Sequence, residues 1–142
     1  MPDPYVQDLL DGAWDVFAVL SARGRTRYVS PSNERILGYT PQDLIGTNGF
    51  DLVHPEDRPA LEDALAQLQQ APDQPVTFTH RFRAADGRWR TLESTLHNKL
   101  DHPTIRGVVV HSHDITDRTE LHAELHRAQQ HLRRLQLHPH FV

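Results

Sequence analysis

The sequence predicts an α+β fold in which one antiparallel sheet carries helices on one of its faces. Two strand-like segments come first, short helices and one longer helix follow, and three more strand-like segments come after them. Helices that stand between two groups of antiparallel strands are typical of this class. The last strand runs directly into a polar helix, so we look for the function at that connection.

The composition limits the classes of protein to which this chain can belong. Its 142 residues, 37% of them hydrophobic, suit a single domain with an ordinary core. The absence of cysteine excludes disulfides, thiolate metal sites, cysteine nucleophiles and photochemistry that needs a cysteine–flavin bond. A net charge of −4 argues against a nucleic-acid binder, and no apolar run has the length of a membrane span. Because the start does not resemble a signal peptide, we expect a cytoplasmic chain with no nucleic-acid or membrane partner.

The first elements are short. Residues 4–12 form an amphipathic segment that Gly12 would end as a helix. An apolar strand over residues 16–21 and a second strand over 25–29 follow, with a turn at Gly24 between them.

Two short helices come next. Ser30 and Thr40 each precede a proline, as N-cap residues do, and Asp43 stands three residues after Thr40, in capping-box spacing. Ile36 and Leu37 are the residues that the first of these helices is expected to bury.

A longer helix is predicted over residues 58–69. Its cap is expected near Asp57, because Pro59 is tolerated only in the first turn. Its apolar face consists of Leu61, Ala64, Leu65 and Leu68.

Three strands close the domain. Residues 76–83 alternate between apolar and polar positions, and an Asp86-Gly87 turn leads into a strand over 88–98. The final strand follows a turn at 100–103. Its β-branched apolar run predicts that both of its faces are covered.

Residues 117–142 are expected to form an output helix. Its apolar residues recur at alternating intervals of four and three, the spacing of a coiled-coil seam. The seam residues are Leu121, Leu125, Ala128, Leu132 and Leu135. The seam predicts a parallel homodimer. It is little more than two heptads long, so the domain would have to contribute contacts, and the helix over residues 4–12 is one candidate for them.

Asp114, Thr116 and Asp117 stand where the last strand turns into that helix. In the plain interpretation Thr116 or Asp117 caps the helix, with Glu120 three residues after Asp117. In the functional interpretation Asp114, Thr116 and Asp117 are a signal hinge between sheet and helix. The two interpretations are compatible.

Five short segments, in the same order, resemble a PAS domain. They are Tyr-Val-Ser-Pro-Ser-Asn (28–33), Leu-Gly-Tyr-Thr-Pro (37–41), His-Pro-Glu-Asp-Arg (54–58), Asp-Gly-Arg-Trp-Arg (86–90) and Asp-Ile-Thr-Asp-Arg (114–118). The resemblance covers about residues 14–118. It implies a five-stranded sheet in the order 2-1-5-4-3, helices packed around a small pocket, and a sensory or dimerising role. The chain would then consist of an N-terminal cap helix (1–13), a PAS sensory domain (14–116) and the output segment (117–142).

The end of the chain resembles a different family. Gln136-Leu137-His138-Pro139-His140-Phe141 is similar to the Gln-x-x-Pro-His-Phe motif that starts the dimerisation segment in one class of sensor histidine kinases. The resemblance implies that His140 is the phosphoacceptor, and that an ATP-binding domain and a response regulator are partners in the intact protein. The alternative for His140 is an ordinary terminal residue. We expect this chain to be a fragment of such a kinase.

The pocket that the resemblance implies has a predicted lining. Its members are Phe17, Val19, Ile36, Phe78, His80, Phe82, Leu92, Leu96 and Ser112. His80 stands between Phe78 and Phe82 on the apolar face of its strand. A hydrogen-bonded core histidine is the alternative to a ligand contact there.

No cofactor is predicted. Haem-binding PAS domains usually hold the iron through a histidine of the long helix, but residues 58–70 contain none, and nothing argues for flavin. His111 and His113 share one face of a strand, and His122 and His126 lie one helical turn apart. Either pair would suit zinc, but no third ligand is defined, so ordinary surface histidines are the stronger interpretation.

Enzyme motifs are missing from the sequence. There is no phosphate-binding Gly-rich loop, no Gly-x-Ser-x-Gly and no His-Glu-x-x-His, so we expect no catalysis by this fragment. The predicted function is a sensory module of a sensor histidine kinase, relaying a pocket or packing signal through its C-terminal helix. The alternatives are a ligand-free dimerisation module and a metal- or haem-binding sensor.

Overall fold

The computed structural model describes residues 15–136 of the chain. The strands are β1 (Asp15–Leu20), β2 (Thr26–Val29), β3 (Val76–Arg83), β4 (Trp89–Lys99) and β5 (Gly107–Asp114). The helices are α2 (Ser32–Ile36), α3 (Pro41–Leu44), α4 (Arg58–Gln70) and α5 (Thr116–Gln136), with 3₁₀ turns η1 (Gly49–Leu52) and η2 (Pro55–Asp57). The helix predicted over residues 4–12 lies outside the described residues.

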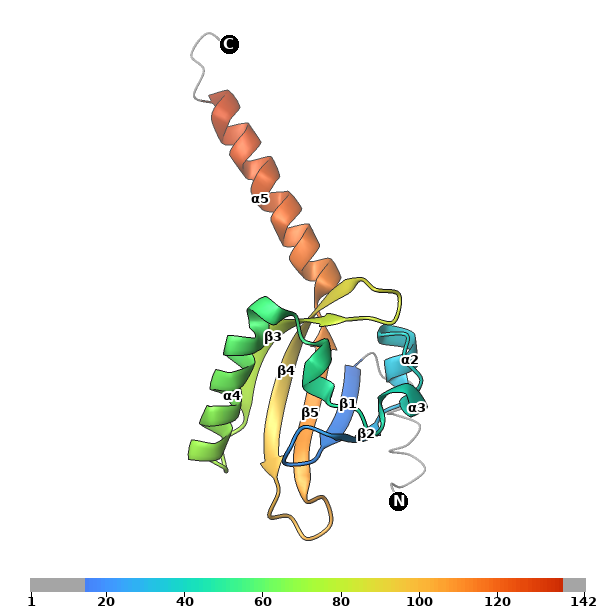
Figure 1. Ribbon diagram of the computed structural model, residues 1–142. Helices are drawn as coiled ribbons and strands as arrows, with labels where there is room; N and C mark the ends of the chain where they lie inside the picture. Colours follow the sequence, from blue (N-terminus) through green and yellow to red (C-terminus); the bar gives the residue numbers. More distant parts are fainter. Residues whose placement is uncertain (1–14, 137–142) are drawn as a thin grey trace, which may run out of the picture.

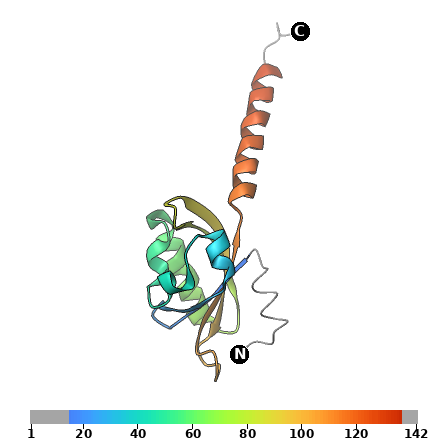
Figure 2. The ribbon, with the colours of Figure 1, turned by 90° about the vertical axis from the view of Figure 1, so that its right-hand side faces the viewer.

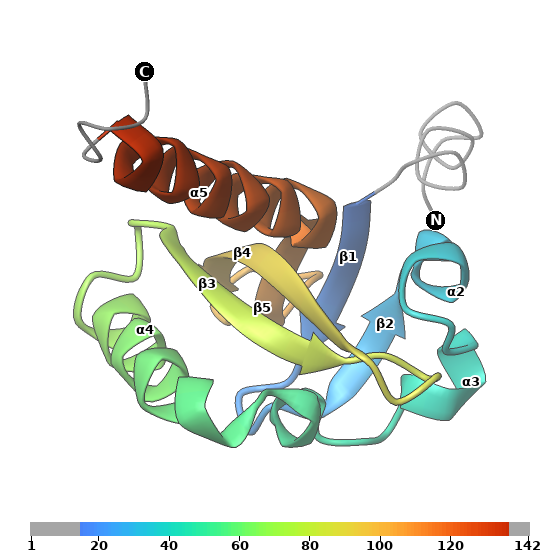
Figure 3. The ribbon, with the colours of Figure 1, turned by 90° about the horizontal axis from the view of Figure 1, so that it is seen from above.

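The five strands form one antiparallel sheet in the order β2-β1-β5-β4-β3 (Figure 1). The predicted fold class and strand order are therefore confirmed. The last strand, β5, pairs with both β1 and β4 and so lies at the centre of the sheet. α2, α3 and α4 cover one face of the sheet (Figure 3). α5 leaves the end of β5 and projects away from the domain (Figures 1 and 2).

The core lies between the sheet and these helices, in two clusters. The first consists of Val16, Val29, Leu37, Leu44 and Leu92, and the second of Leu20, Ala64, Leu68, Leu96 and Val108. Each fully buried Val or Leu side chain among them contributes about 1.5–3 kcal/mol to folding. Within residues 15–136, no helix combines the length and the apolar character that crossing a lipid bilayer requires.

The starts of the two short helices differ from each other. The capping box predicted at Thr40 is confirmed: its Oγ1 accepts the Asp43 N–H (3.3 Å), and the Asp43 carboxylate accepts the Thr40 N–H (3.0 Å). The prediction that the Ser30 side chain caps α2 is wrong. Ser30 Oγ accepts the Phe17 N–H at 2.9 Å and lies 2.8 Å from Ser32 Oγ, so Ser30 ties α2 to β1.

The prediction that Asp57 caps α4 with its side chain is also wrong, because its carboxylate binds Arg81 instead. The carboxylate accepts the backbone N–H of Arg81 (2.6 Å) and two guanidinium N–H groups of the same residue (3.0 Å each), while no side-chain cap forms at α4. These hydrogen bonds lower the pKa of Asp57. They fasten the start of α4 to β3.

The expectation that β5 is covered on both faces is wrong for the part of the chain that the structure describes. Val108 and Ser112 are buried on the helix-covered face. On the opposite face Val109 and His111 are half-buried and His113 is exposed. A β-branched run alone does not distinguish a doubly covered strand from a central strand with one open face.

Candidate sensory cavity and output junction

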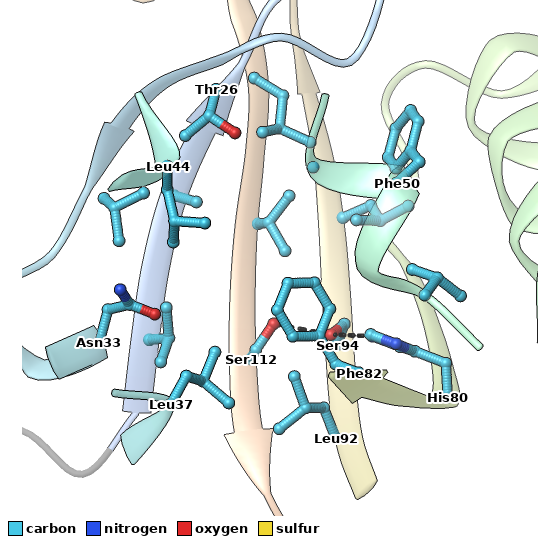
Figure 4. Close-up of a pocket in the computed structure, with 18 of the residues that line it drawn as sticks. Thr26, Asn33, Leu37, Leu44, Phe50, His80, Phe82, Leu92, Ser94 and Ser112 are labelled. Atoms are coloured by element: carbon cyan, nitrogen blue, oxygen red, sulfur yellow. Dashed lines mark hydrogen bonds between the residues drawn. The ribbon is translucent and has the colours of Figure 1, made fainter. Parts of the chain in front are cut away.

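A cavity of about 90 Å³ lies between the sheet and its covering helices (Figure 4). All five strands contribute to its wall, and so do α2, α3, η1 and α4. The lining is apolar except for Thr26, Asn33, His80, Ser94 and Ser112, and it includes no residue that carries a full charge at neutral pH. The cavity therefore suits a small uncharged group.

Six of the nine residues predicted to line the pocket do so. They are Phe78, His80, Phe82, Leu92, Leu96 and Ser112. Among the polar lining residues, sequence reasoning missed Thr26, Asn33 and Ser94. The signal for Ser94 was present, because it alternates with Leu92 and Leu96 on the same strand. No local signal marked Asn33, whose position depends on how α2 packs.

Phe17, Val19 and Ile36 do not line the cavity, so these three predictions were wrong. Val16 of β1 pairs with Ser112 of β5, which turns Phe17 and Val19 to the opposite face of the sheet. There the ring of Phe17 stacks on His111 with centroids 4.5 Å apart. Ile36 is half-buried and packs against the core beside the cavity.

Three polar side chains form a hydrogen-bonded chain across the sheet. His80 Nε2 of β3 lies 2.8 Å from Ser94 Oγ of β4, which lies 2.7 Å from Ser112 Oγ of β5 (Figure 4). Burial lowers the pKa of His80, whose exposed fraction is 6%. The imidazole is therefore neutral at pH 7. The alternative prediction was a core histidine whose ring nitrogens are hydrogen-bonded. It is confirmed for Nε2, which bonds Ser94, but Nδ1 is buried without a hydrogen-bond partner.

Asn33 faces the same cavity from α2. Its side chain is completely buried, and its Nδ2 donates to the carbonyl oxygen of Tyr39 at 2.8 Å. Its Oδ1 has no hydrogen-bond partner. In the described part of the chain, Asn33 Oδ1 and His80 Nδ1 are the buried side-chain atoms left without one.

The junction between β5 and α5 is held by a compact set of hydrogen bonds. Asp114 Oδ1 accepts the backbone N–H of Thr116 (2.9 Å) and its hydroxyl (2.6 Å), while Asp114 Oδ2 pairs with Arg90 Nε (2.9 Å). Thr116 Oγ1 in turn accepts the N–H of Thr91 on β4 (2.8 Å), and the Ile115 N–H donates to the Thr91 carbonyl (2.8 Å). Asp114 and Thr116, two of the predicted hinge residues, thus connect the central strand, its neighbour and the helix.

The capping arrangement differs from the predicted one. Asp114, rather than Thr116 or Asp117, provides the carboxylate at the start of α5, since the Thr116 hydroxyl is engaged with β4. Asp117 is exposed in the first turn, where a negative charge suits the helix dipole.

Residues 26–103 match the family described as PAS fold, a match that spans more than half of the chain. The chain belongs to the PAS fold family. It is a PAS module of sensory and signal-transducing type.

The curated relatives of this PAS module are much longer proteins. White collar 2 protein of Neurospora crassa is 35% identical over 100 residues, which are 68% of this chain and 17% of that protein. Basic helix-loop-helix ARNT-like protein 2 of Homo sapiens is 35% identical over 74 residues, 52% of this chain and 12% of that protein. The chain thus spans less than a fifth of the length of either relative.

Solved PAS structures share the fold. The Drosophila melanogaster Cycle PAS-B with bound ethylene glycol superposes with a TM-score of 0.63 at 22% identity, covering 70% of this chain and 98% of that one. The PAS domain of a protein from Colwellia psychrerythraea gives a TM-score of 0.68 at 19% identity, covering 80% and 96%. At these identities the likeness extends to the fold alone.

The seam predicted on the output helix of the PAS module is exposed. Leu121, Leu125 and Leu132 keep 57%, 55% and 58% of their surface exposed, Ala128 is exposed and Leu135 is half-buried. An apolar stripe of this kind on a single helix is unusual without a partner.

The histidine pairs proposed as weak metal ligands are placed as follows. His111 Nε2 lies 2.7 Å from Asp15 Oδ2, and His113 Nδ1 hydrogen-bonds Asp15 Oδ1. Although burial opposes the effect, these hydrogen bonds lower the pKa of Asp15. His126 Nε2 lies 3.1 Å from Gln130, and His122 is exposed on α5. Within residues 15–136, no three His, Cys, Asp or Glu side chains are arranged to hold a metal ion.

The remaining predicted site lies beyond the described residues. His140, the candidate phosphoacceptor, belongs to residues 137–142, and α5 is described as far as Gln136, the first residue of the kinase-like motif.

Proposed function

We propose that this chain is the input module of a homodimeric signalling protein, in which the state of the cavity controls α5. One observation carries the proposal. Ser112 lines the cavity, and Asp114, two residues further along β5, holds the first residue of α5. Residues two apart point to the same face of a strand. A group that displaces Ser112 therefore acts on a rigid segment that ends at the helix.

A modest free energy is sufficient for such a signal. A helix cap contributes about 1 kcal/mol. A ligand shifts an equilibrium between two conformations by its difference in affinity for them, so a bias of this size changes their populations several-fold. Rearranging the hydrogen bonds of Asp114 and Thr116 would supply a change of that order.

The output of this module would be the arrangement of two parallel α5 helices. The exposed leucines support a second copy of the same helix as the partner, because their spacing is that of a coiled-coil seam. The ion pair between Arg90 and Asp114 would fix the angle at which each helix leaves its domain.

Cysteine cross-linking tests this arrangement, and the chain contains no cysteine of its own. In a parallel pair, Leu121→Cys and Leu132→Cys should each form a disulfide-linked dimer under mild oxidation. Ala123→Cys, on the opposite side of the helix, should not. Cross-linking equal to that of Ala123→Cys at both seam positions, or a monomer by light scattering at high concentration, would contradict the dimer.

For the intact protein we propose a sensor histidine kinase. The proposal is supported by the Gln-x-x-Pro-His-Phe motif at residues 136–141, into which α5 leads. His140 would accept the phosphoryl group from an ATP-binding domain and pass it to a response regulator. The PAS module itself would perform no catalysis.

The names of the curated relatives favour a second candidate for the intact protein. White collar 2 protein and Basic helix-loop-helix ARNT-like protein 2 are not named as kinases, so the parent of this module would be a regulator of their kind. The two candidates differ in one measurable property, phosphorylation of His140 in the full-length protein.

A further inference from the structure

Among the described residues of the PAS module, the two buried side-chain atoms without a hydrogen-bond partner belong to residues that line the same cavity. Asn33 Oδ1 and His80 Nδ1 have no partner within the described chain, although buried polar atoms in folded proteins almost always have one. Asn33 lies at one side of the cavity and His80 at the other (Figure 4). A molecule inside the cavity is therefore the natural partner for Asn33 Oδ1, whereas the His80 ring is also influenced by the backbone of Arg81.

The chemistry required by Asn33 can be specified. Its Nδ2 faces the carbonyl oxygen of Tyr39, which only accepts hydrogen bonds, so the amide cannot be flipped without losing that bond. The atom turned toward the cavity is thus Oδ1, an acceptor (Figure 4). Whatever binds beside it must donate an O–H or N–H.

His80 restricts the charge of the occupant. Its ring is neutral because of burial, and the cavity wall carries no charged side chain. If the proton is on Nε2, Nδ1 is an acceptor; if it is on Nδ1, that atom is a donor. In neither form is there a counter-charge for a bound ion, and burying an unpaired ion is costly.

The rest of the wall is apolar and partly aromatic. Phe50, Phe78 and Phe82 all contribute to the lining. Aromatic rings favour a flat apolar molecule, which packs against them by stacking or edge-to-face contact.

We propose that the cavity binds a small uncharged molecule with an apolar, aromatic body and one hydroxyl group that donates to Asn33 Oδ1. This inference rests on the proposed function only in treating the cavity as the sensory site. It concerns binding alone, so its test does not depend on α5.

Phenol and toluene are matched probes, because they have nearly the same shape and differ in the hydroxyl. Binding of each to the 142-residue chain can be measured by nuclear magnetic resonance titration. We expect phenol to bind at least as tightly as toluene, although phenol loses more hydrogen bonds to water on entering. Tighter binding of toluene, or no binding of either probe, would overturn the proposal.

Two variants identify the atom responsible. In Asn33→Leu the ratio of phenol affinity to toluene affinity should fall about tenfold, the usual effect of one buried hydrogen bond. In Thr26→Val, which changes another polar residue of the lining without changing its size, the ratio should stay the same. An unchanged ratio in Asn33→Leu would overturn the assignment of Asn33. If that variant does not fold, the comparison of the two probes on the unmodified chain still decides the proposal.

Discussion

His80 shows how a polar residue is accommodated in an apolar cavity wall. One ring nitrogen is paired with Ser94, burial keeps the ring neutral, and the other nitrogen is buried without a hydrogen-bond partner in the described chain. A sequence that places His between two Phe on one strand face identifies the position. It does not reveal the partner, which lies on the neighbouring strand.

The lowered pKa of His80 makes a prediction about stability and pH. In the unfolded chain the imidazole takes up a proton as the pH falls through its ordinary value of 6.5, whereas the folded chain resists protonation. Below about pH 6.5 His80 should therefore make the domain less stable, by at most about 1.4 kcal/mol per pH unit, until the lowered folded-state pKa is reached.

Urea unfolding of the unmodified chain and of His80→Gln between pH 7.5 and pH 5 measures this effect. The free energy of unfolding of the unmodified chain should fall relative to that of the variant as the solution becomes more acidic. Every other ionisable group is the same in both proteins, so only the contribution of His80 remains in the difference. A difference that is independent of pH, or that moves in the opposite direction, would refute the assignment of a neutral buried imidazole.

Residue-level predictions from the sequence failed where a side chain had two available partners. Asp57 and Ser30 occupy helix starts, and their types are those of N-cap residues. In the structure the Asp57 carboxylate accepts the N–H of Arg81, and the Ser30 hydroxyl oxygen accepts the N–H of Phe17. Both donors belong to strands distant in sequence. Thr40 has no such competitor, and there the local prediction was confirmed.

At the level of elements, the difficulty was to choose a face for β1. Both faces of this strand carry apolar residues: Val16, Ala18 and Leu20 on one, and Phe17 and Val19 on the other. The alternation that identified the inward face of β3 is therefore absent. The face is decided by the pairing of β1 with β5, which a single sequence does not reveal.

The hydrogen bonds of Asp114 predict how its removal affects the start of α5. Asp114→Ala removes the acceptor for the Thr116 N–H and leaves Arg90 unpaired. We expect a loss of about 1–3 kcal/mol in the free energy of unfolding. The first turn of α5 should also exchange its amide hydrogens faster, because its cap is gone.

Asp117→Ala is the matched control, since it removes an exposed carboxylate from the same turn. Its effect on unfolding should stay within about 0.5 kcal/mol, as for other exposed positions. Hydrogen exchange and denaturant unfolding measure both variants. Equal effects of the two substitutions would mean that Asp114 is not the residue that holds the helix.

For the whole molecule, the order of strands and helices was predictable because turn residues and helix-start residues divide the sequence clearly. Gly24 and Gly87 both adopt positive φ at the turns where they were expected, +83° and +86°. The arrangement of α2 over the cavity was not predictable, because it depends on bonds such as that from Asn33 to Tyr39. The polar atoms inside the cavity therefore emerged only from the structure.

The central strand β5 contributes to the cavity wall and also leads into the output helix. The polar chain from His80 through Ser94 ends on Ser112 of β5, and the same strand ends at Asp114, which holds α5. A change in the cavity can therefore reach the helix without passing through a flexible loop. Under the proposed function, such a change alters the arrangement of the two α5 helices.

The most direct test is the distance between the two α5 helices, measured by pulsed electron paramagnetic resonance with a nitroxide on Ala123→Cys. Ser94→Val breaks the polar chain and adds volume inside the cavity. This substitution perturbs the cavity directly, so the test does not depend on the identity of the ligand. We predict that Ser94→Val shifts the distance distribution when Asp114 is present, and that the shift disappears when Asp114→Ala is added. An unchanged distribution in folded Ser94→Val, or the same shift with and without Asp114, would contradict the account.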